Sequence, residues 1–363
     1  MNKKFSKKLI STLALVSALF IAVTAFGGCG SDSESGDGTV TITNVSYDPT
    51  RELYKAYNNL FVEHIKQEKG TDVEIIQSHG GSGKQALEVA NGLEADVITL
   101  VTLALEADVD AVKNAGLIDE GYTSEFSLDS SPYTSSIVFL VRKGNPKNIH
   151  DWNDLLKSDV GVITPNPKTS GGARWNYLAG WYYFEKQGQS EEEIEKSIQT
   201  LYKNVVVLDS GARGSTTSFV ENGQGDVLIA WENEAFLSLK EYPGEYEIVV
   251  PSVSILCQPT VAVVDEVVDK RNTREIAEEY LNYLYSDEAQ ELEVEWFYRP
   301  SDEETLKKYT YEGDSNTITE IPSDNKWIVT NVDLTDIKHF GGWTEATEKH
   351  FADGGVFDQI YEK

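Results

Sequence analysis

Four segments of the chain combine glycine or alanine with hydroxyl side chains in a pattern that can bind an anion. Each follows a short β-branched run and precedes a stretch of helical periodicity; they are residues 44–51, 78–85, 166–175 and 210–217. The first turn of a helix leaves backbone N–H groups unpaired and carries a partial positive charge. Small residues let a ligand approach the backbone, and Ser or Thr hydroxyls add donors. Four such turns, two of them with Gly-Gly, favour one oxyanion site at the carboxyl ends of strands.

The elements that must position these turns alternate between short strands and helices. Strands are expected at 40–45, 72–77, 96–103, 135–141, 160–163, 204–208, 227–230, 246–250 and 260–264, and helices at 51–67, 85–93, 173–187, 216–222 and 273–285. This alternation predicts an α/β protein with parallel sheets and helices on both faces. The polar stretch 301–337 is expected to be irregular surface structure. The length after the N-terminal segment is too great for one core and predicts two domains.

The N-terminal segment has the pattern of a secretory signal peptide over residues 1–28. A lysine-rich start is followed by an apolar run and by Gly27-Gly28, directly before Cys29. We expect cleavage before Cys29 and lipid attachment to it, as in bacterial lipoproteins, with residues 29–39 forming a flexible tether. An uncleaved signal anchor is the alternative. Both place the folded part outside the cytoplasmic membrane, anchored to its outer face, and in the periplasm if a second membrane exists.

The composition excludes several classes of protein. The chain has 31 basic and 60 acidic residues and a net charge of −29, which becomes −33 without the four lysines of residues 1–28. No basic stripe is present, so a nucleic-acid partner is not expected. With Cys29 assigned to lipid, only Cys257 remains, and no internal disulfide can form. We expect Cys257 to be a small buried residue near an interdomain crossing. A cage of backbone dipoles and neutral hydroxyls can hold an anion without net positive charge.

No metal, cofactor or catalytic group is expected. The five histidines lack metal-ligand spacing, and Gly83-Lys84 lacks the flanking residues of a P-loop. An enzyme of sulfuryl or phosphoryl transfer would need a nucleophile paired with a base, for which Ser82 and His79 are the only candidates. The sequence therefore favours a binding protein over an enzyme.

Seven sequence blocks resemble the sulfate-binding proteins of bacterial ABC importers, a family that includes thiosulfate-binding proteins. They are NVSYDPTRELY (44–54), QSHGGSGKQA (77–86), PYTSSIVFLVRKGNPKNIHDWNDL (132–155), ITPNPKTSGGARWNYLAGW (163–181), VLDSGARGSTTSFVENGQGDVLIAWENEA (207–235), FYRP (297–300) and HFADGGVFDQI (350–360). The resemblance implies a two-lobed, type II periplasmic-binding-protein fold with a two-strand hinge. Combined with the expected strands, it assigns residues 40–138 and 259–363 to lobe I and residues 139–258 to lobe II. The stretch 96–105 departs from the family by about three extra residues.

The resemblance also implies the ligand and its contacts. Dehydrated sulfate would be held in the interlobe cleft without a salt bridge, by backbone N–H groups, one hydroxyl and one indole. These contacts carry over to the backbone of Asp48, Gly171, Gly172 and Ala212, the hydroxyl of Ser82 and the indole of Trp231. Asp48 is expected to be a helix N-cap, with Pro49 at the first helical position. Arg174 and Arg213 are expected to reach solvent or acidic neighbours rather than the ligand.

The function implied is that of the substrate-binding subunit of an ABC importer. Closure of the lobes on sulfate would let this protein, a monomer without cofactor, deliver the anion to a permease with a cytoplasmic ATPase. Thiosulfate is the alternative main ligand, and phosphate, molybdate and tungstate are weaker candidates. A surface protein outside transport, such as a sensor or an adhesin subunit, is the alternative from another class.

Overall fold

The computed structural model describes residues 38–361 apart from 102–111, 113–114, 120 and 314. The expected signal peptide, the lipid-modified Cys29 and most of the tether lie outside the described residues, as does part of the stretch 96–105. No helix in the described ranges is both long and apolar enough to cross a bilayer.

The first sheet has four strands in the order β10-β3-β1-β2. Their bounds are Thr39–Tyr47 for β1, Asp72–Gly80 for β2, Val97–Leu100 for β3 and Thr260–Val263 for β10. Strand β1 pairs in parallel with β2 and β3, whereas β10 is antiparallel to β3. Side chains along β10 alternate between two apolar cores, with Val261 and Val263 in one and Ala262 in the other.

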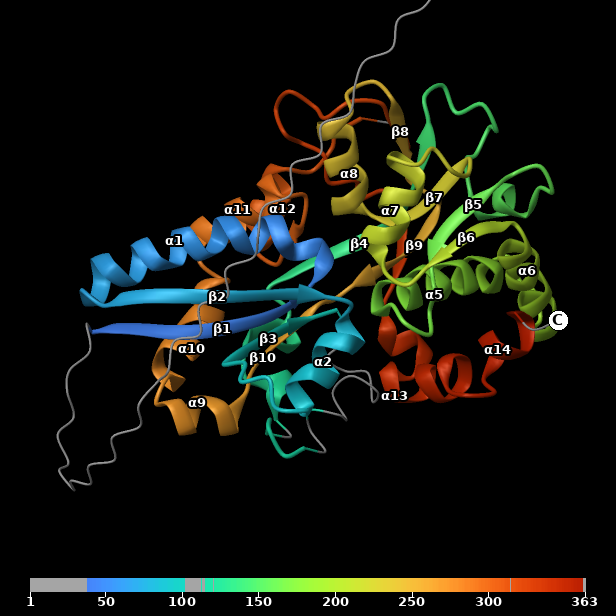
Figure 1. Cartoon of the computed structure of the whole chain (residues 1–363). Coiled ribbons are helices and arrows are strands. Elements are labelled where there is room, and N and C mark those ends of the chain that lie inside the picture. Colours follow the sequence, from blue (N-terminus) through green and yellow to red (C-terminus); the bar gives the residue numbers. More distant parts are fainter. Residues whose placement is uncertain (1–37, 102–111, 113–114, 120, 314, 362–363) are drawn as a thin grey trace, which may run out of the picture. The chain divides into compact units, whose positions relative to one another are not determined.

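Helices cover both faces of the first sheet, as the sequence predicts (Figure 1). One face packs against α1 (Arg51–Lys69) and α10 (Arg274–Tyr283), and the other against α2 (Ser82–Ala90) and α9 (Asp265–Arg271). Gly70 ends α1 in the left-handed conformation that favours glycine, with φ of 67°.

The second sheet has nine strands built around β4, which spans Tyr133–Arg142. The others are β5 (Val162–Pro165), β6 (Val205–Asp209), β7 (Val227–Trp231), β8 (Tyr246–Val249), β9 (Val253–Cys257), β11 (Arg299–Pro300), β12 (Thr317–Ile318) and β13 (Asp333–Thr335). Strand β5 is parallel to β6 and β7, and β4 is antiparallel to β7, β8, β9 and β11. The expectation of parallel sheets therefore holds for the pairs of β1 and β5 but not for those of β4 and β10, nor for the antiparallel pair of β12 and β8. Strand β4 pairs with strands that follow it by more than 80 residues, and β10 follows β3 by about 160, so local strand–helix alternation does not set the direction of these pairs.

Helices also cover both faces of the second sheet. Ile137, Phe139 and Val141 of β4 face one core, and Val138 and Leu140 face another. The first core includes α5 (Gly171–Lys186), α6 (Glu191–Lys203) and the C-terminal helices α13 (Gly342–Ala346) and α14 (Val356–Tyr361). The second core includes α7 (Ala212–Val220) and α8 (Glu232–Glu241). The remaining longer helices are α11 (Asp287–Glu295) and α12 (Glu303–Lys308).

The described part of the stretch 301–337 is largely irregular and exposed, as its polarity predicts, but it also forms short elements and buries a few side chains. It contains α12, β12 and β13, and its few apolar side chains enter the core beside α8. Trp327 and Ile328 are fully buried there, and the Trp327 indole donates a hydrogen bond to the Val294 carbonyl at 3.3 Å. A short apolar cluster within polar sequence is thus enough to anchor the segment.

The proposed lobe boundaries remain a prediction, although the strands at which the chain was expected to cross are present. Strand β4 pairs with β11 and β9 near its start and with β7 and β8 further on. Cys257, the last residue of β9, is fully buried as expected, and β10 of the first sheet follows at Thr260. The C-terminal part of the chain packs largely on the second sheet, because β12 pairs with β8 and α14 contacts α6.

His350 buries an imidazole in this C-terminal packing. Its ring lies edge-on to Trp181 at 4.5 Å, and its Nδ1 lies 3.2 Å from the Tyr177 hydroxyl. Burial, and to a lesser extent the neighbouring Lys349, lowers the pKa of His350 to about 3. The neutral imidazole is therefore the form that fits the fold.

Acid should destabilise the protein through His350. In the unfolded chain the imidazole has its ordinary pKa of about 6.5. Its contribution to the free energy of unfolding is therefore fully present above pH 6.5 and is lost as the pH falls toward 3. At pH 5 the loss is about 2 kcal/mol. Urea unfolding of the wild-type protein and of His350→Gln at pH 7.5 and pH 5 measures this loss. The free energy of unfolding should fall less in the variant than in the wild type between the two pH values. The exposed His339→Gln is the control, and an equal loss in all three proteins would contradict the assignment.

Candidate functional site

All six residues predicted to contact the ligand line one small cavity. Its wall is formed by Tyr47, Asp48, Pro49, Gly80, Gly81, Ser82, Val101, Ser170, Gly171, Gly172, Gly211, Ala212 and Trp231. The first seven end or follow strands β1, β2 and β3 of the first sheet, and the others belong to elements around the second sheet. We call this space the front cavity.

Four helical segments begin at the front cavity. Helix α2 starts at Ser82, α5 at Gly171 and α7 at Ala212, and a short 3-10 helix starts at Asp48. Gly81, Ser170 and Gly211 precede the three α-helices in extended conformations, which turns each chain from its strand into its helix. The N–H groups of a first helical turn have no partner within the helix. The wall is therefore rich in backbone donors and in positive helix ends.

Ser82 provides a hydroxyl to the front cavity. Only 3% of the residue is exposed, and its Oγ has no hydrogen-bond partner in the described part of the chain. It is the first residue of α2 rather than its cap, because Gly81 holds the cap position. A buried hydroxyl without a partner is costly, so Ser82 is well suited to bind a ligand atom.

Trp231 provides an indole N–H at the end of β7. The residue is 3% exposed, and its ring lies 5.9 Å from the ring of Tyr47, the last residue of β1. Its Nε1 donates a hydrogen bond of 3.3 Å to the Gly172 carbonyl, which is longer than usual for an N–H donor. A Cβ on Gly172 would lie 3.4 Å from this nitrogen, which is an ordinary van der Waals contact.

Asp48 is not the N-cap that was expected. Tyr47 holds that position without a side-chain cap, and Asp48 is the first residue of the 3-10 turn Asp48–Thr50, which precedes α1. Pro49 fixes the backbone in this turn, and the Asp48 carboxylate accepts a hydrogen bond of 2.9 Å from Arg51. The charge of Asp48 is thus paired with a cation, while its backbone remains on the cavity wall.

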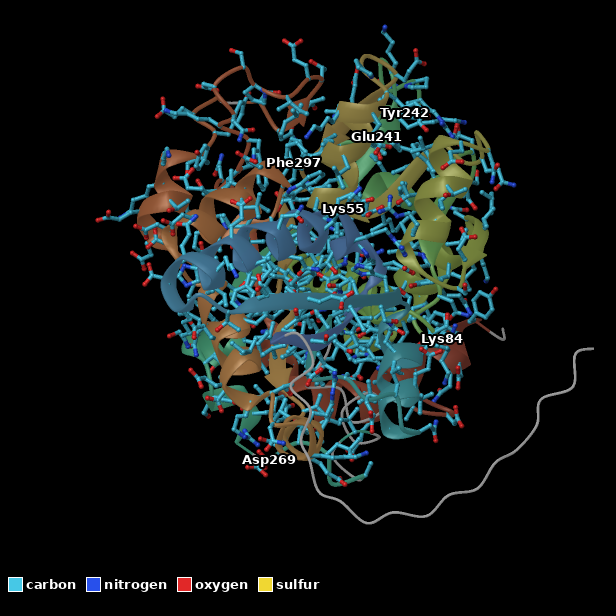
Figure 2. The ribbon with its side chains drawn as sticks, turned by 60° about the vertical axis from the view of Figure 1, so that its left-hand side comes forward. Lys55, Lys84, Glu241, Tyr242, Asp269 and Phe297 are labelled. Atoms are coloured by element: carbon cyan, nitrogen blue, oxygen red, sulfur yellow. The ribbon has the colours of Figure 1, made fainter. Side chains whose placement is uncertain are left out.

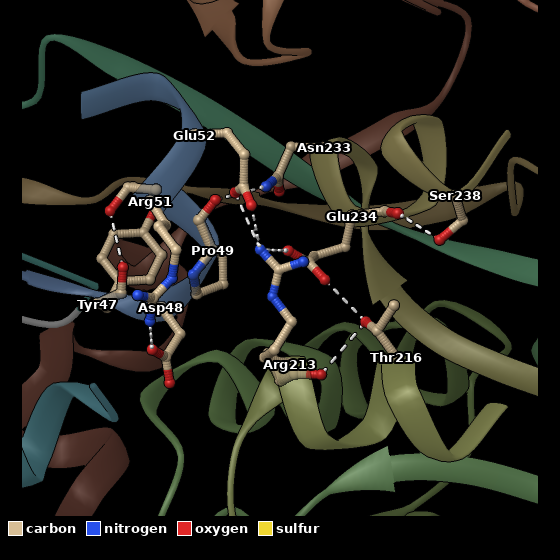
Figure 3. Close-up of polar contacts among 12 residues, drawn as sticks. Tyr47, Asp48, Pro49, Arg51, Glu52, Arg213, Thr216, Asn233, Glu234 and Ser238 are labelled. Atoms are coloured by element: carbon tan, nitrogen blue, oxygen red, sulfur yellow. Dashed lines mark hydrogen bonds and ion pairs between the residues drawn. The ribbon is translucent and has the colours of Figure 1, made fainter. Parts of the chain in front are cut away.

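Arg213 connects elements of the two sheets beside the front cavity (Figure 3). Its Nη2 donates to both carboxylate oxygens of Glu52 on α1, at 3.0 and 2.9 Å, and lies 3.8 Å from Glu234 on α8. Burial opposes the charge of Arg213, but Glu234 and Glu52 outweigh burial and raise its pKa. Burial raises the pKa of Glu234, against the effects of Arg213 and Thr216. The acidic partner that the sequence predicts for Arg213 is present.

Arg174 and Lys168 anchor the loop that carries Gly171 and Gly172. Arg174 is buried rather than solvent-exposed, and its Nε donates to the Pro167 carbonyl at 2.9 Å. The Lys168 ammonium donates to the Phe351 carbonyl at 3.0 Å and to Asp353 and Asp358 at 3.1 Å each. The sequence reasoning missed this anchor, although the lysine beside a Gly-Gly turn and the acidic block 350–360 were visible.

Catalytic and metal-binding alternatives find little support in the described residues. Ser82 Oγ and His79 Nδ1 both lack a hydrogen-bond partner, so they do not form a nucleophile–base pair through these atoms. Burial and the nearby Arg51 lower the pKa of His79. Lys84 lies on the outer surface of α2 with its side chain 76% exposed (Figure 2). No group of three or more His, Cys, Asp or Glu side chains in the ranges described could hold a metal ion.

Comparisons with known proteins agree with this architecture. The profile of the bacterial extracellular solute-binding proteins matches residues 44–299. The chain is 55% identical over 326 residues to the sulfate-binding protein of Escherichia coli K12, covering 89% of this chain and 94% of that protein. It is 43% identical over 347 residues to the thiosulfate-binding protein of Pseudomonas aeruginosa, covering 95% and 97%. The sulfate-binding protein SubI from Mycobacterium tuberculosis H37Rv superposes with a TM-score of 0.72 at 29% identity, covering 86% and 99%.

Two helix-covered sheets with a donor-lined cavity between their elements define a two-domain binding protein of the periplasmic type. The chain belongs to the family of bacterial extracellular solute-binding proteins. Within that family it is similar to members that bind sulfate and members that bind thiosulfate.

Loss of the Lys168 anchor should loosen the C-terminal segment. Lys168→Met leaves two carboxylates and one carbonyl without their shared cation, and we expect a loss of about 1 kcal/mol in unfolding free energy. Hydrogen exchange should show faster amide exchange in residues 350–358. The control is Lys196→Met, which removes an exposed pair with Glu192. Equal effects of the two substitutions on residues 350–358 would contradict the anchor.

Proposed function

We propose that this protein is the substrate-binding subunit of an ABC importer and that it captures sulfate in the front cavity. The observation that carries the proposal is the convergence of four helical N-termini, one unpartnered hydroxyl and one indole N–H on a single buried space. Such a site favours a negatively charged ligand whose outer atoms all accept hydrogen bonds. Sulfate-binding relatives at 55% identity support the choice of ligand.

The size of the front cavity supports a bare tetrahedral oxyanion. The volume open to the centre of a water molecule is about 20 Å³. Adding the radius of that water gives a spherical hole of about 3 Å radius, which suits sulfate without its hydration shell. A dehydrated dianion needs many strong hydrogen bonds, each contributing about 1.5–3 kcal/mol. Six donors of the proposed set can reach micromolar affinity, about −8 kcal/mol.

The charges around the cavity support selection of the ligand by its own protonation state, in favour of a fully deprotonated anion. Among the described residues that line it, Asp48 alone has an ionised side chain, and Arg51 pairs with it. Protonated oxyanions such as hydrogen phosphate carry an O–H that requires an acceptor, and the six proposed contacts supply donors. Thiosulfate also accepts hydrogen bonds without donating any. It remains the second candidate because thiosulfate-binding relatives are 43% identical.

Capture would proceed by closure of the two proposed lobes, residues 40–138 with 259–363 and residues 139–258. Donors from both sides meet the anion only when the lobes are together, so sulfate stabilises the closed state. The bond between Glu52 and Arg213 spans the same junction. A permease with a cytoplasmic ATPase would then accept the anion from a monomeric, cofactor-free receptor.

Calorimetric titration of purified residues 30–363 tests the proposal. Sulfate should bind one to one with micromolar or tighter affinity, and thiosulfate, phosphate and molybdate are the competitors. Trp231→Ala and Ser82→Ala should each weaken sulfate binding by about 10- to 100-fold, because each removes a hydrogen bond to a charged ligand. Ser190→Ala, at the start of the distant α6, is the control and should bind as wild type.

Tight binding of another of these anions would support the proposed site but contradict sulfate as its ligand. Wild-type affinity in both site variants would overturn the proposed contacts. Failure of the wild-type protein to bind any of the four anions would overturn the receptor function itself.

We also propose that Cys29 carries the lipid anchor on the outer face of the cytoplasmic membrane. The signal-like segment before Cys29 and the polar residues after it support this assignment. In bacterial cells the wild-type protein should fractionate with membranes, and mass spectrometry should find a lipid-modified N-terminal cysteine. Cys29→Ala should lack that modification, and the anchor is wrong if the wild-type N-terminal peptide carries no lipid.

A further inference from the structure

A second, smaller cavity lies directly behind the wall of the front cavity. Its volume open to the centre of a water molecule is about 10 Å³, and it is bordered by Pro165, Gly172, Asn176, Ala212, Ser215, Thr216, Leu228, Ile229, Ala230, Trp231 and Glu234. Gly172, Ala212 and Trp231 line both spaces. We call this space the rear cavity.

Three residues that line the rear cavity each have one buried polar atom without a hydrogen-bond partner in the described part of the chain. These atoms are the Oγ of Ser215, the Oδ1 of Asn176 and the Oε1 of Glu234. The three residues are 1%, 3% and 2% exposed, so bulk water does not reach them. Leaving three such atoms unpaired in one small space would be costly.

The other polar atoms of two of these side chains are already bonded, which fixes their orientation. The Asn176 amide nitrogen donates to the Thr164 hydroxyl at 3.1 Å and to the Ile229 carbonyl at 3.0 Å. The Glu234 Oε2 accepts from the Thr216 hydroxyl at 2.8 Å (Figure 3). Each side chain is thereby left with one oxygen atom free to accept a hydrogen bond.

We propose that the rear cavity is a binding site for one water molecule, which links Ser215, Asn176 and Glu234. The volume is that of a single-water site, which needs about 10–15 Å³ by the same measure and two to four polar partners. The hydrogen-bond count also balances. The water donates one hydrogen to Asn176 and one to Glu234, and it accepts the hydroxyl hydrogen of Ser215.

A metal cation fits this site less well than water. Three oxygen atoms from the named side chains are too few for calcium or magnesium, which take six or more. The Glu234 carboxylate also already faces Arg213, whose guanidinium lies 3.8 Å from the same Oε1. A neutral molecule that both donates and accepts matches the three groups.

The water would position the contacts of the front cavity. Its partners belong to α5, α7 and α8, and the same three helix starts carry Gly172, Ala212 and Trp231. Trp231 immediately precedes α8, and the other two lie in the first turns of their helices. A shared water therefore fixes the mutual distances of three proposed anion contacts without touching the anion. This consequence rests on the proposed function, whereas the water site itself does not.

A crystal structure of the mature protein at atomic resolution tests the site directly. We expect one peak in the rear cavity at about 2.7–3.0 Å from all three oxygen atoms. An empty rear cavity would overturn the proposal. A peak with ligand distances of about 2.3–2.6 Å would overturn it in favour of a cation.

Ser215→Ala tests the positioning role, with Ser218→Ala as its matched control on the same helix. Ser218 is also buried, but its hydroxyl donates to Asp209 and does not line the rear cavity. In Ser215→Ala the peak should weaken or vanish, and sulfate should bind about fivefold to tenfold more weakly through faster dissociation. Ser218→Ala should keep both the peak and an affinity within about twofold of wild type.

The outcomes separate the two proposals. Loss of the water with unchanged sulfate affinity would overturn the positioning role. A wild-type protein that holds the water and binds no sulfate would overturn the proposed ligand and leave the water site standing.

Discussion

The central constraint in this structure is that the starts of several helices must meet within one small space. A helix end carries about half an elementary charge, and its effect fades within a turn, so a single end cannot offset the dehydration of an anion. In this fold, strands β1, β2 and β7 end at the front cavity. Helices α2, α5 and α7 begin there, at Ser82, Gly171 and Ala212. The carboxyl ends of strands in both sheets thus decide where the positive helix ends lie.

The same constraint explains how a chain of net charge −29 can present an anion site. Cations around the site bind protein groups: Arg51 binds Asp48, Arg213 binds Glu52, and Lys168 binds the C-terminal segment. Their role is to hold the loops and helices in place, while neutral donors face the cavity. Since no Lys or Arg is among the described residues that line the cavity, the proposed anion binding would depend on the geometry of the N–H groups, which suits an anion that donates no hydrogen bond.

Much of the site could be predicted from the sequence because the signals for a helix start are local. Gly-Gly at the start of α5 and the small residues before α2 and α7 mark the turns wherever they lie in the fold. Local rules failed at Asp48, because Pro49 places a 3-10 turn there and Tyr47 takes the cap position. They also could not foresee that Lys168 meets Asp358 or that Trp327 is buried, since both depend on distant parts of the chain. The proposed role of Trp231 came from family resemblance, because an isolated tryptophan carries no local signal.

The wall between the two cavities is also restricted in side-chain size. Gly172 and Ala212 must present N–H groups to the front cavity and also leave room for polar atoms behind them. A larger side chain at Gly172 would meet the Trp231 indole at about van der Waals distance. Moving the indole would in turn disturb the α8 start, where Glu234 borders the rear cavity. In the proposed site, small residues in these turns would serve the backbone donors and the packing behind them together. The proposed water would then make the geometry of the front cavity depend on the polar groups of the rear cavity.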